Sequence, residues 1–311
     1  MLQTFLALVP IFLLIAAGWA MRAILIRDDA MWRPIERLAY YLLIPALVIH
    51  DLSVADLGSL PFWRMVVALL GAILIVAGVL VILRPALSRI LVEGNAGFTS
   101  VFQGSVRANF FIILAAAPTL LPAYGAALVI VAVAFFTVTV NLLSVLVLAR
   151  WGGSGEANLV SLVKRLLTNP FIAATALGIA LNLSRLPVPV VIDTTLVLMA
   201  GAGVPLALLT AGSGLRLASL GTHLPGLFIA SFARLVATPA IAFGLGSLLG
   251  LDAAVLAMLV MFHSQPTSTS SYVLARQMGG DHELMAAILT THTLVAIVTI
   301  PLMLALFGLE L

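Results

Sequence analysis

The stretch His263–Ser271, HSQPTSTSS, contains eight polar residues and one proline in a row. It lies between the apolar runs AAVLAMLVMF (253–262) and YVLA (272–275). The whole segment from Ala253 to Ala275 has 23 residues, which is about 34 Å as a helix. That length crosses the roughly 30 Å hydrocarbon core of a bilayer. The polar stretch is therefore predicted to lie near the middle of a membrane span.

The composition predicts an all-α polytopic membrane protein. Of 311 residues, 63% are hydrophobic and 9% are charged, whereas soluble domains are about 25% charged. The net charge is only +3 and the basic residues are scattered, so we expect no nucleic-acid partner. The N-terminus has no basic region and no cleavage site after its apolar run, which favours a retained first span over a signal peptide.

Apolar runs separated by charged residues or by Gly/Pro clusters predict ten spans. They cover roughly residues 3–26, 34–54, 61–83, 97–120, 123–149, 168–184, 189–214, 222–249, 253–276 and 284–308. The fourth and the ninth contain the most polar residues.

The basic residues predict the orientation of these spans. Eleven of them lie in the connections after spans 1, 3, 5, 7 and 9: Arg22, Arg27, Arg33, Arg37, Arg84, Arg89, Arg150, Lys164, Arg165, Arg216 and Arg276. The opposite side holds only Arg64 and Arg185. Because cytoplasmic loops carry the excess of Lys and Arg, we expect both termini to lie outside.

The chain is predicted to contain an internal repeat. The polar segment 151–167 separates a first five-span repeat (1–150) from a second (168–311), and we interpret it as a cytoplasmic linker. At an offset of 160 residues, four pairs match: Pro10 with Pro170, Gly18 with Gly178, Pro45 with Pro205, and Ser53 with Ser213. Five spans per half is an odd number, so the second half must be inverted, an architecture typical of transporters. The offset also aligns span 4 with span 9.

The ninth span is predicted to be interrupted. Pro266 lacks a backbone N–H and clashes with the preceding turn, and the hydroxyl residues after it favour a new helix start. His263 and Ser264 would end one half-helix, and residues 267–271 would form the first turn of the next. The free N–H groups of such a turn attract an anion. The alternative is a simple proline kink, which does not require His263, Gln265 and five hydroxyl residues.

The fourth span, FTSVFQGSVRANFFIILAAAP (98–118), carries Gln103, Arg107 and Asn109 at membrane depth. A buried arginine is costly unless it is paired, hydrated or extended to the interface. Arg107 is therefore either a site residue or a side chain that reaches the cytoplasm. Asn109 is too short to reach the interface, so it is expected to bond to span 9 or to a ligand.

Several motifs resemble the auxin efflux carrier family, specifically its bacterial permease branch. They are ERLAYYLLIPALVIHDLS (36–53), Asn109 in span 4, Asn169–Pro170 at the start of span 6, and QPTSTSSYVLARQMGGD (265–281). The family usually has a proline seven residues after the asparagine of span 4, where this chain has Ala116. The resemblance extends over essentially the whole chain.

The resemblance implies ten helices in two inverted repeats, with broken helices 4 and 9 crossing at the substrate site. It implies transport of small organic anions such as carboxylates by an elevator-type movement, efflux as the direction, a homodimer, and the bacterial inner membrane as the location. The substrate-binding candidates are Asn109, His263, Gln265, Pro266, Thr267, Ser268, Thr269 and Ser270. The secondary candidates are Gln103, Arg107, Tyr41, Ser271 and His292.

Other polar residues allow two interpretations each. Asp51 could couple protons or cap its span at the outer interface, and His292 could relay protons or be satisfied by neighbouring threonines. Arg234 is expected to pair with a carbonyl group or with Asp51. Tyr40 and Tyr41 could pack or line the site.

Rival functions are less well supported by the sequence. The spans contain neither an aspartate pair nor an H-E-x-x-H motif, and the GGSG string (152–155) lies in the linker, so we expect no enzyme, no catalytic residues, no metal and no cofactor. A sodium-coupled organic anion symporter with the same broken helices is the main alternative, although spans 4 and 9 lack acidic residues. A channel is less compatible with polar breaks between apolar walls.

Overall fold

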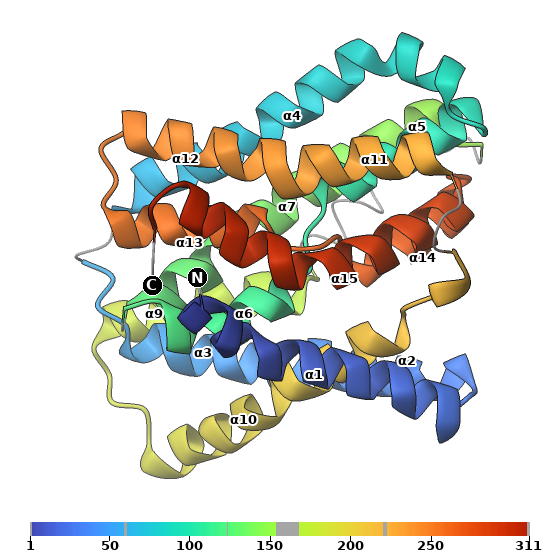
Figure 1. Cartoon of the computed structure of the whole chain (residues 1–311). Coiled ribbons are helices and arrows are strands. Elements are labelled where there is room, and N and C mark those ends of the chain that lie inside the picture. The colour runs from blue at the N-terminus through green and yellow to red at the C-terminus, as the bar shows by residue number, and fades with distance from the viewer. Residues whose placement is uncertain (1, 59–60, 123, 154–167, 220–222, 310–311) are drawn as a thin grey trace.

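The computed structural model describes residues 2–58, 61–122, 124–153, 168–219 and 223–309, and every regular element within them is helical (Figure 1). Eight helical segments there are long and apolar enough to cross a membrane. The predicted sixth span corresponds to the shorter α9, and the predicted ninth is divided between α13 and α14. The predicted linker, with Lys164 and Arg165, lies almost wholly outside the described residues.

The helices pack as two groups, seen below and above in Figure 1. The lower one, here named the scaffold group, contains α1 (Leu2–Ile24), α2 (Asp29–Leu38), the π-turn η1 (Ala39–Leu43), α3 (Ile44–Val54), α9 (Pro170–Ser184) and α10 (Val190–Ser213).

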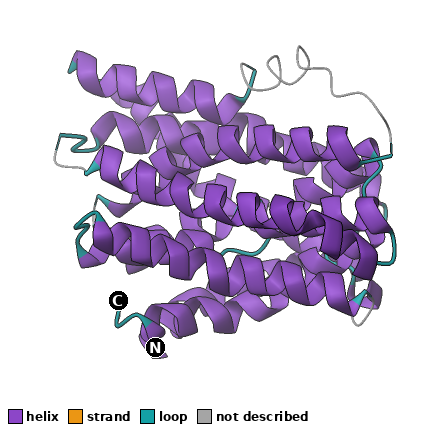
Figure 2. Cartoon of the chain, turned by 90° about the horizontal axis from the view of Figure 1, so that it is seen from above, coloured by secondary structure: helices purple, strands orange, loops and turns teal. Residues whose placement is uncertain are grey.

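The other group, here named the crossover group, contains the interrupted helices and lies mostly above in Figure 1, with α6 (Phe110–Leu120) in contact with α1 and α10 where the two groups meet. Its elements are α4 (Phe62–Ile90), α5 (Gly94–Val106), α6 (Phe110–Leu120), α7 (Gly125–Trp151), α11 (Leu224–Phe232), the π-turn η3 (Ala233–Ala237), α12 (Thr238–Leu248), α13 (Ala253–His263), α14 (Thr269–Met278) and α15 (His282–Leu306). The short turn η2 (Leu217–Ser219) follows α10. Figures 1 and 2 show the long helices running along one common direction, with the two ends of the described chain at the same end of the molecule.

Close glycine contacts hold the scaffold group together. A Cβ on Gly18 of α1 would collide with the backbone carbonyl of Leu209 in α10, and one on Gly178 of α9 would lie 3.3 Å from the carbonyl oxygen of Ile49 in α3. Gly18 and Gly178 are 160 positions apart, and so are Ile49 and Leu209. The offset found in the sequence therefore recurs in the packing of two separate helix pairs.

A third contact joins two residues that are themselves 160 positions apart. A Cβ on Gly203 of α10 would lie 3.1 Å from the carbonyl carbon of Leu43, at the end of η1.

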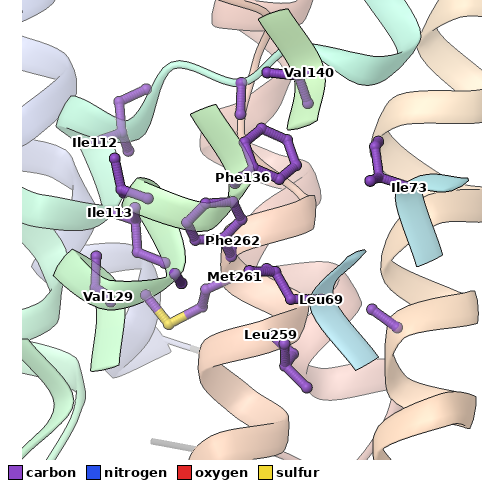
Figure 3. Close-up of a cluster of buried hydrophobic side chains, with 14 of the residues drawn as sticks. Leu69, Ile73, Ile112, Ile113, Val129, Phe136, Val140, Leu259, Met261 and Phe262 are labelled. Atoms are coloured by element: carbon purple, nitrogen blue, oxygen red, sulfur yellow. The ribbon is translucent and has the colours of Figure 1, made fainter. Parts of the chain in front are cut away.

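An apolar core supports the crossover group from α4, α6, α7 and α13 (Figure 3). The rings of Phe136 on α7 and Phe262 on α13 meet edge to face at 4.9 Å, with Met261 and Ile113 close by in the same cluster. Because close-packed interiors resist deformation, this core fixes the end of α13 against α6 and α7. It thereby sets the position of both helix breaks.

Candidate binding site at the two helix breaks

The structure interrupts both polar spans and brings the two interruptions together. α5 ends at Val106 and α6 begins at Phe110, while α13 ends at His263 and α14 begins at Thr269. The backbone N–H of Asn109 donates to the carbonyl of Pro266 at 2.8 Å. Each break thus satisfies a backbone group of the other, which is how irregular backbone is tolerated at membrane depth.

Side-chain caps start the second half of each interrupted helix. Asn109 Oδ1 accepts from the N–H of Phe111 at 3.2 Å, and Ser268 Oγ accepts from the N–H of Ser270 at 3.4 Å. The sequence places the first turn of the second half-helix at residues 267–271, directly after Pro266. The structure corrects this boundary, because Pro266 lies within the break and the helix begins two residues after Thr267.

Arg107 is held inside the protein by two side chains. It is 8% exposed, and its Nη1 donates to Asn141 Oδ1 at 2.8 Å while its Nη2 donates to Ser270 Oγ at 2.9 Å. Its Nε has no partner among the described residues. Of the two interpretations of Arg107, the structure therefore favours the paired, buried side chain over one that extends to the cytoplasm.

A cavity of about 480 Å³ lies at these breaks, between the two helix groups. Its lining includes Arg107, Asn109, Asn141 and residues 268–270 from the crossover group. The scaffold group contributes Glu36, Arg37, Tyr40, Tyr41 and Asn169. Volumes of roughly 300–1,000 Å³ are typical of small-molecule sites.

A third helix also begins at the cavity. Asn169 caps α9 by accepting from the N–H of Phe171 at 2.9 Å, with Pro170 as the first helical residue. The hydroxyl of Tyr40 donates to the same Asn169 oxygen at 3.3 Å. The N-termini of α6, α9 and α14 therefore all meet the cavity, each with the partial positive charge of a helix start.

The charges around the cavity favour an anion. The guanidinium of Arg107 and the three helix N-termini are positive, and Glu36, the one acidic lining residue among those described, is exposed and lies one position before Arg37 in the sequence. Helix N-termini and arginine together are a common arrangement for binding carboxylate or phosphate groups. Among the described residues, no group of three or more His, Asp or Glu side chains could hold a metal ion.

The predicted site residues separate into two sets. Asn109, Arg107, Tyr41, Ser268, Thr269 and Ser270 line the cavity. Seven others do not: Gln103, His263, Gln265, Pro266, Thr267, Ser271 and His292. Gln265, for example, donates from Nε2 to the carbonyl of Met261 at 2.8 Å, and the Thr267 and Ser271 hydroxyls share a hydrogen bond of 3.3 Å.

Two asparagines that line the cavity were not predicted as ligands. Asn141 lies in an otherwise apolar predicted span, where an amide at membrane depth is itself a signal of function. Asn169 was noted only as part of a motif. Both asparagines orient other groups, because Asn141 holds Arg107 and Asn169 begins α9.

Arg234 lies behind the second break rather than in the cavity. It is fully buried, its Nε donates to the carbonyl of Gln265 at 2.9 Å, and its Nη2 donates to that of Phe262 at 3.2 Å. Of the two predicted partners, it therefore binds carbonyl groups and not Asp51. Asp51 instead contacts His50, at 3.0 Å.

A comparison with known families adds one finding. The sequence model of the family described as "Membrane transport protein" matches residues 3–304 of the chain. That match covers both interrupted spans and both helix groups. No curated protein matches the chain.

Proposed function

The chain belongs to the auxin efflux carrier and membrane transport protein family, and we propose that it is a secondary active transporter of small organic anions such as carboxylates. Membership identifies a membrane transporter. Substrate class, site and mechanism are inferred from the geometry of the chain.

The observation that carries the proposal is the convergence of Arg107 with three helix N-termini at one cavity. A carboxylate entering it would lie beside the guanidinium of Arg107 and replace water at the side-chain amide of Asn109 and at the donors of Ser268–Ser270. Such charge-assisted bonds are about twice as strong as neutral ones. Asn141 and Ser270 hold the guanidinium in place beforehand, so little order is lost on binding.

The packing of the helices supports an elevator-type movement of the crossover group against the scaffold group. The cavity is lined by both groups, so a displacement of one group changes its access. The glycine contacts at a spacing of 160 residues support two inverted five-helix repeats, ten helices in total. Inverted repeats are typical of transporters in which one group of helices moves against the other to alternate access to the site.

The cavity is proposed to face the cytoplasm. Its exposed lining residue Gln277 lies next to the connection between α14 and α15, and its exposed lining residue Arg37 belongs to α2, which follows the connection after α1. Those connections belong to the side that the basic residues predict to be cytoplasmic. Loading from this side fits efflux across a bacterial inner membrane, with both termini outside, in a homodimer that meets through the scaffold group.

The test is ligand binding followed by transport. A thermal-shift screen of the purified protein against mono- and dicarboxylates should raise the unfolding midpoint, because a ligand of the folded state stabilises it by mass action. The ligands found should then be transported in proteoliposomes. Stabilisation by cations or neutral solutes but by no carboxylate would contradict the proposal.

Single cysteines test the orientation, since the native chain has none. We expect a cysteine at Gln277 to react with an impermeant reagent only in inside-out vesicles, and substrate to protect it. A cysteine at Asp56 should react only in right-side-out vesicles. The opposite pattern would reverse the assigned orientation.

A further inference from the structure

Carbonyl groups at the C-terminal end of α13 and in the break after it accept hydrogen bonds from other parts of the chain. Gln265 Nε2 bonds to the carbonyl of Met261, and Asn109 N–H bonds to that of Pro266. The carbonyl of Gln265 accepts a hydrogen bond from Arg234 Nε, and that of Phe262 accepts one from Arg234 Nη2. The end of a helix carries partial negative charge, so a cation is the natural partner here.

Arg234 is the only charge that the described residues supply at this end. It is 0% exposed, and the described part of the chain contains no carboxylate within salt-bridge distance of it. A buried cation without an acidic partner is costly. Its presence is explained if the carbonyl oxygens of the break serve as its counter-charge.

The local structure around Arg234 directs it to this place. It lies on the π-turn η3, and the hydroxyl of Thr238 donates to the carbonyl of Ala233 at 2.6 Å, satisfying a group of the widened turn. π-turns cost stability and are frequent at functional sites. Its guanidinium also lies 5.8 Å from the ring centre of Phe136, which lines the cavity.

In transporters with broken helices, the unwound carbonyls and helix C-termini commonly bind the coupling sodium ion or proton. Here a covalently attached guanidinium occupies a position of that type. We propose that Arg234 is a fixed internal cation that keeps the α13–α14 break open, and that it replaces a mobile coupling cation in this protein. This proposal rests on the proposed function in one respect, because it takes the cavity beside the α13–α14 break to be the substrate site.

Removal and replacement of the cation test the proposal. Arg234→Ala should lower the unfolding midpoint by about 5–10 °C and weaken substrate binding. Millimolar guanidinium should restore both, whereas urea, its neutral isostere, should restore neither. Arg64→Ala, an exposed arginine on α4, is the control and should respond to neither additive.

Three results would overturn the proposal. One is an Arg234→Ala protein that is as stable as the wild type and binds substrate equally well. Another is equal rescue by urea and guanidinium. The third is a wild-type protein whose substrate binding needs sodium or potassium when either is replaced by choline.

A second pair of variants applies if Arg234→Ala does not fold. Arg234→Lys keeps the charge and should fold with affinity within about tenfold of the wild type, while Arg234→Met should be clearly worse in both respects. Equal behaviour of the two would overturn the proposal. If no carboxylate binds the wild type, the proposed function fails, but rescue of the unfolding midpoint still decides the role of Arg234.

Discussion

The two helix breaks are built from different residues, although each is followed by a half-helix that starts with a side-chain cap. The α5–α6 break is short, contains no proline, and places its own cation, Arg107, towards the cavity. The α13–α14 break is longer, contains Pro266, and receives its cation, Arg234, from η3, whose residues are not among those that line the cavity. One break adds its charge to the lining of the cavity, and at the other the charge bonds to the carbonyl groups of the break itself.

This difference indicates how two breaks that both start a new half-helix contribute unequally to the cavity. Both second half-helices begin with a polar cap, Asn109 or Ser268, so both offer positive helix ends. Only the first break adds a charged side chain to the cavity. We therefore expect substitutions in the first break to affect ligand affinity most, and those in the second to affect mainly the stability of the break.

The largest effect is expected for Arg107→Gln. Truncating one partner of a buried charge pair costs about 2–5 kcal/mol, which is roughly a 30-fold to few-thousandfold loss of affinity. Calorimetry with the best carboxylate measures it, with Arg64→Gln as the control. A folded Arg107→Gln protein with wild-type affinity would remove the first break from the binding site.

A smaller effect is expected at Asn109, where two variants separate capping from binding. Asn109→Ala should lose about 1 kcal/mol of stability with the cap and roughly 10- to 150-fold in affinity if its amide bonds the carboxylate. Asn109→Asp should keep the cap but repel the anion. Normal binding of the Asp variant, in the same calorimetric assay, would show that Asn109 is only a cap.

Pro266→Ala should be milder, because the first break has no proline and still interrupts its helix. Arg234 and the N–H of Asn109 would continue to hold the second break, so affinity should fall by less than about tenfold. Loss of all binding in a folded variant would mean that the proline itself keeps the helix from running through.

Ser268→Ala should have the smallest effect. Its capping bond is long, at 3.4 Å, so we expect a loss of about 0.5–1 kcal/mol of stability and affinity within roughly threefold. Thermal unfolding and calorimetry on the same preparation measure both. An effect as large as that of Asn109→Ala would show that the two caps are equivalent and that the breaks differ less than their residues do.

The sequence indicated the fold well where hydrophobic length was the signal. The long apolar runs reappear as helices, eight segments of which are long and apolar enough to cross a membrane, and the polar fourth and ninth spans are both interrupted. It was less reliable where a helix is short or interrupted. α9 and α13 fall below the length of a full span, and the start of α14 was placed two residues too early, because Ser268 rather than Pro266 caps the helix.

The candidate site was predicted in outline but not in its members. Asn109 and residues 268–270 line the cavity, as a helix start near a break suggests. Gln265 does not, because its amide satisfies the carbonyl of Met261 one turn earlier. Sequence spacing gives the depth of a residue in the membrane but not the direction of its side chain at an irregular backbone.

The sequence by itself determined that this is a helical membrane protein with two polar interruptions. Crossing a bilayer requires long apolar helices, because each unsatisfied polar group exposed to lipid costs free energy. Only the tertiary structure decided which of two buried arginines faces the cavity. Arg107 and Arg234 are equally improbable residues for a membrane span, and their partners lie on other helices, at Asn141 and Ser270 for one and at Phe262 and Gln265 for the other. Such contacts depend on how distant segments pack, which no local pattern of residues specifies.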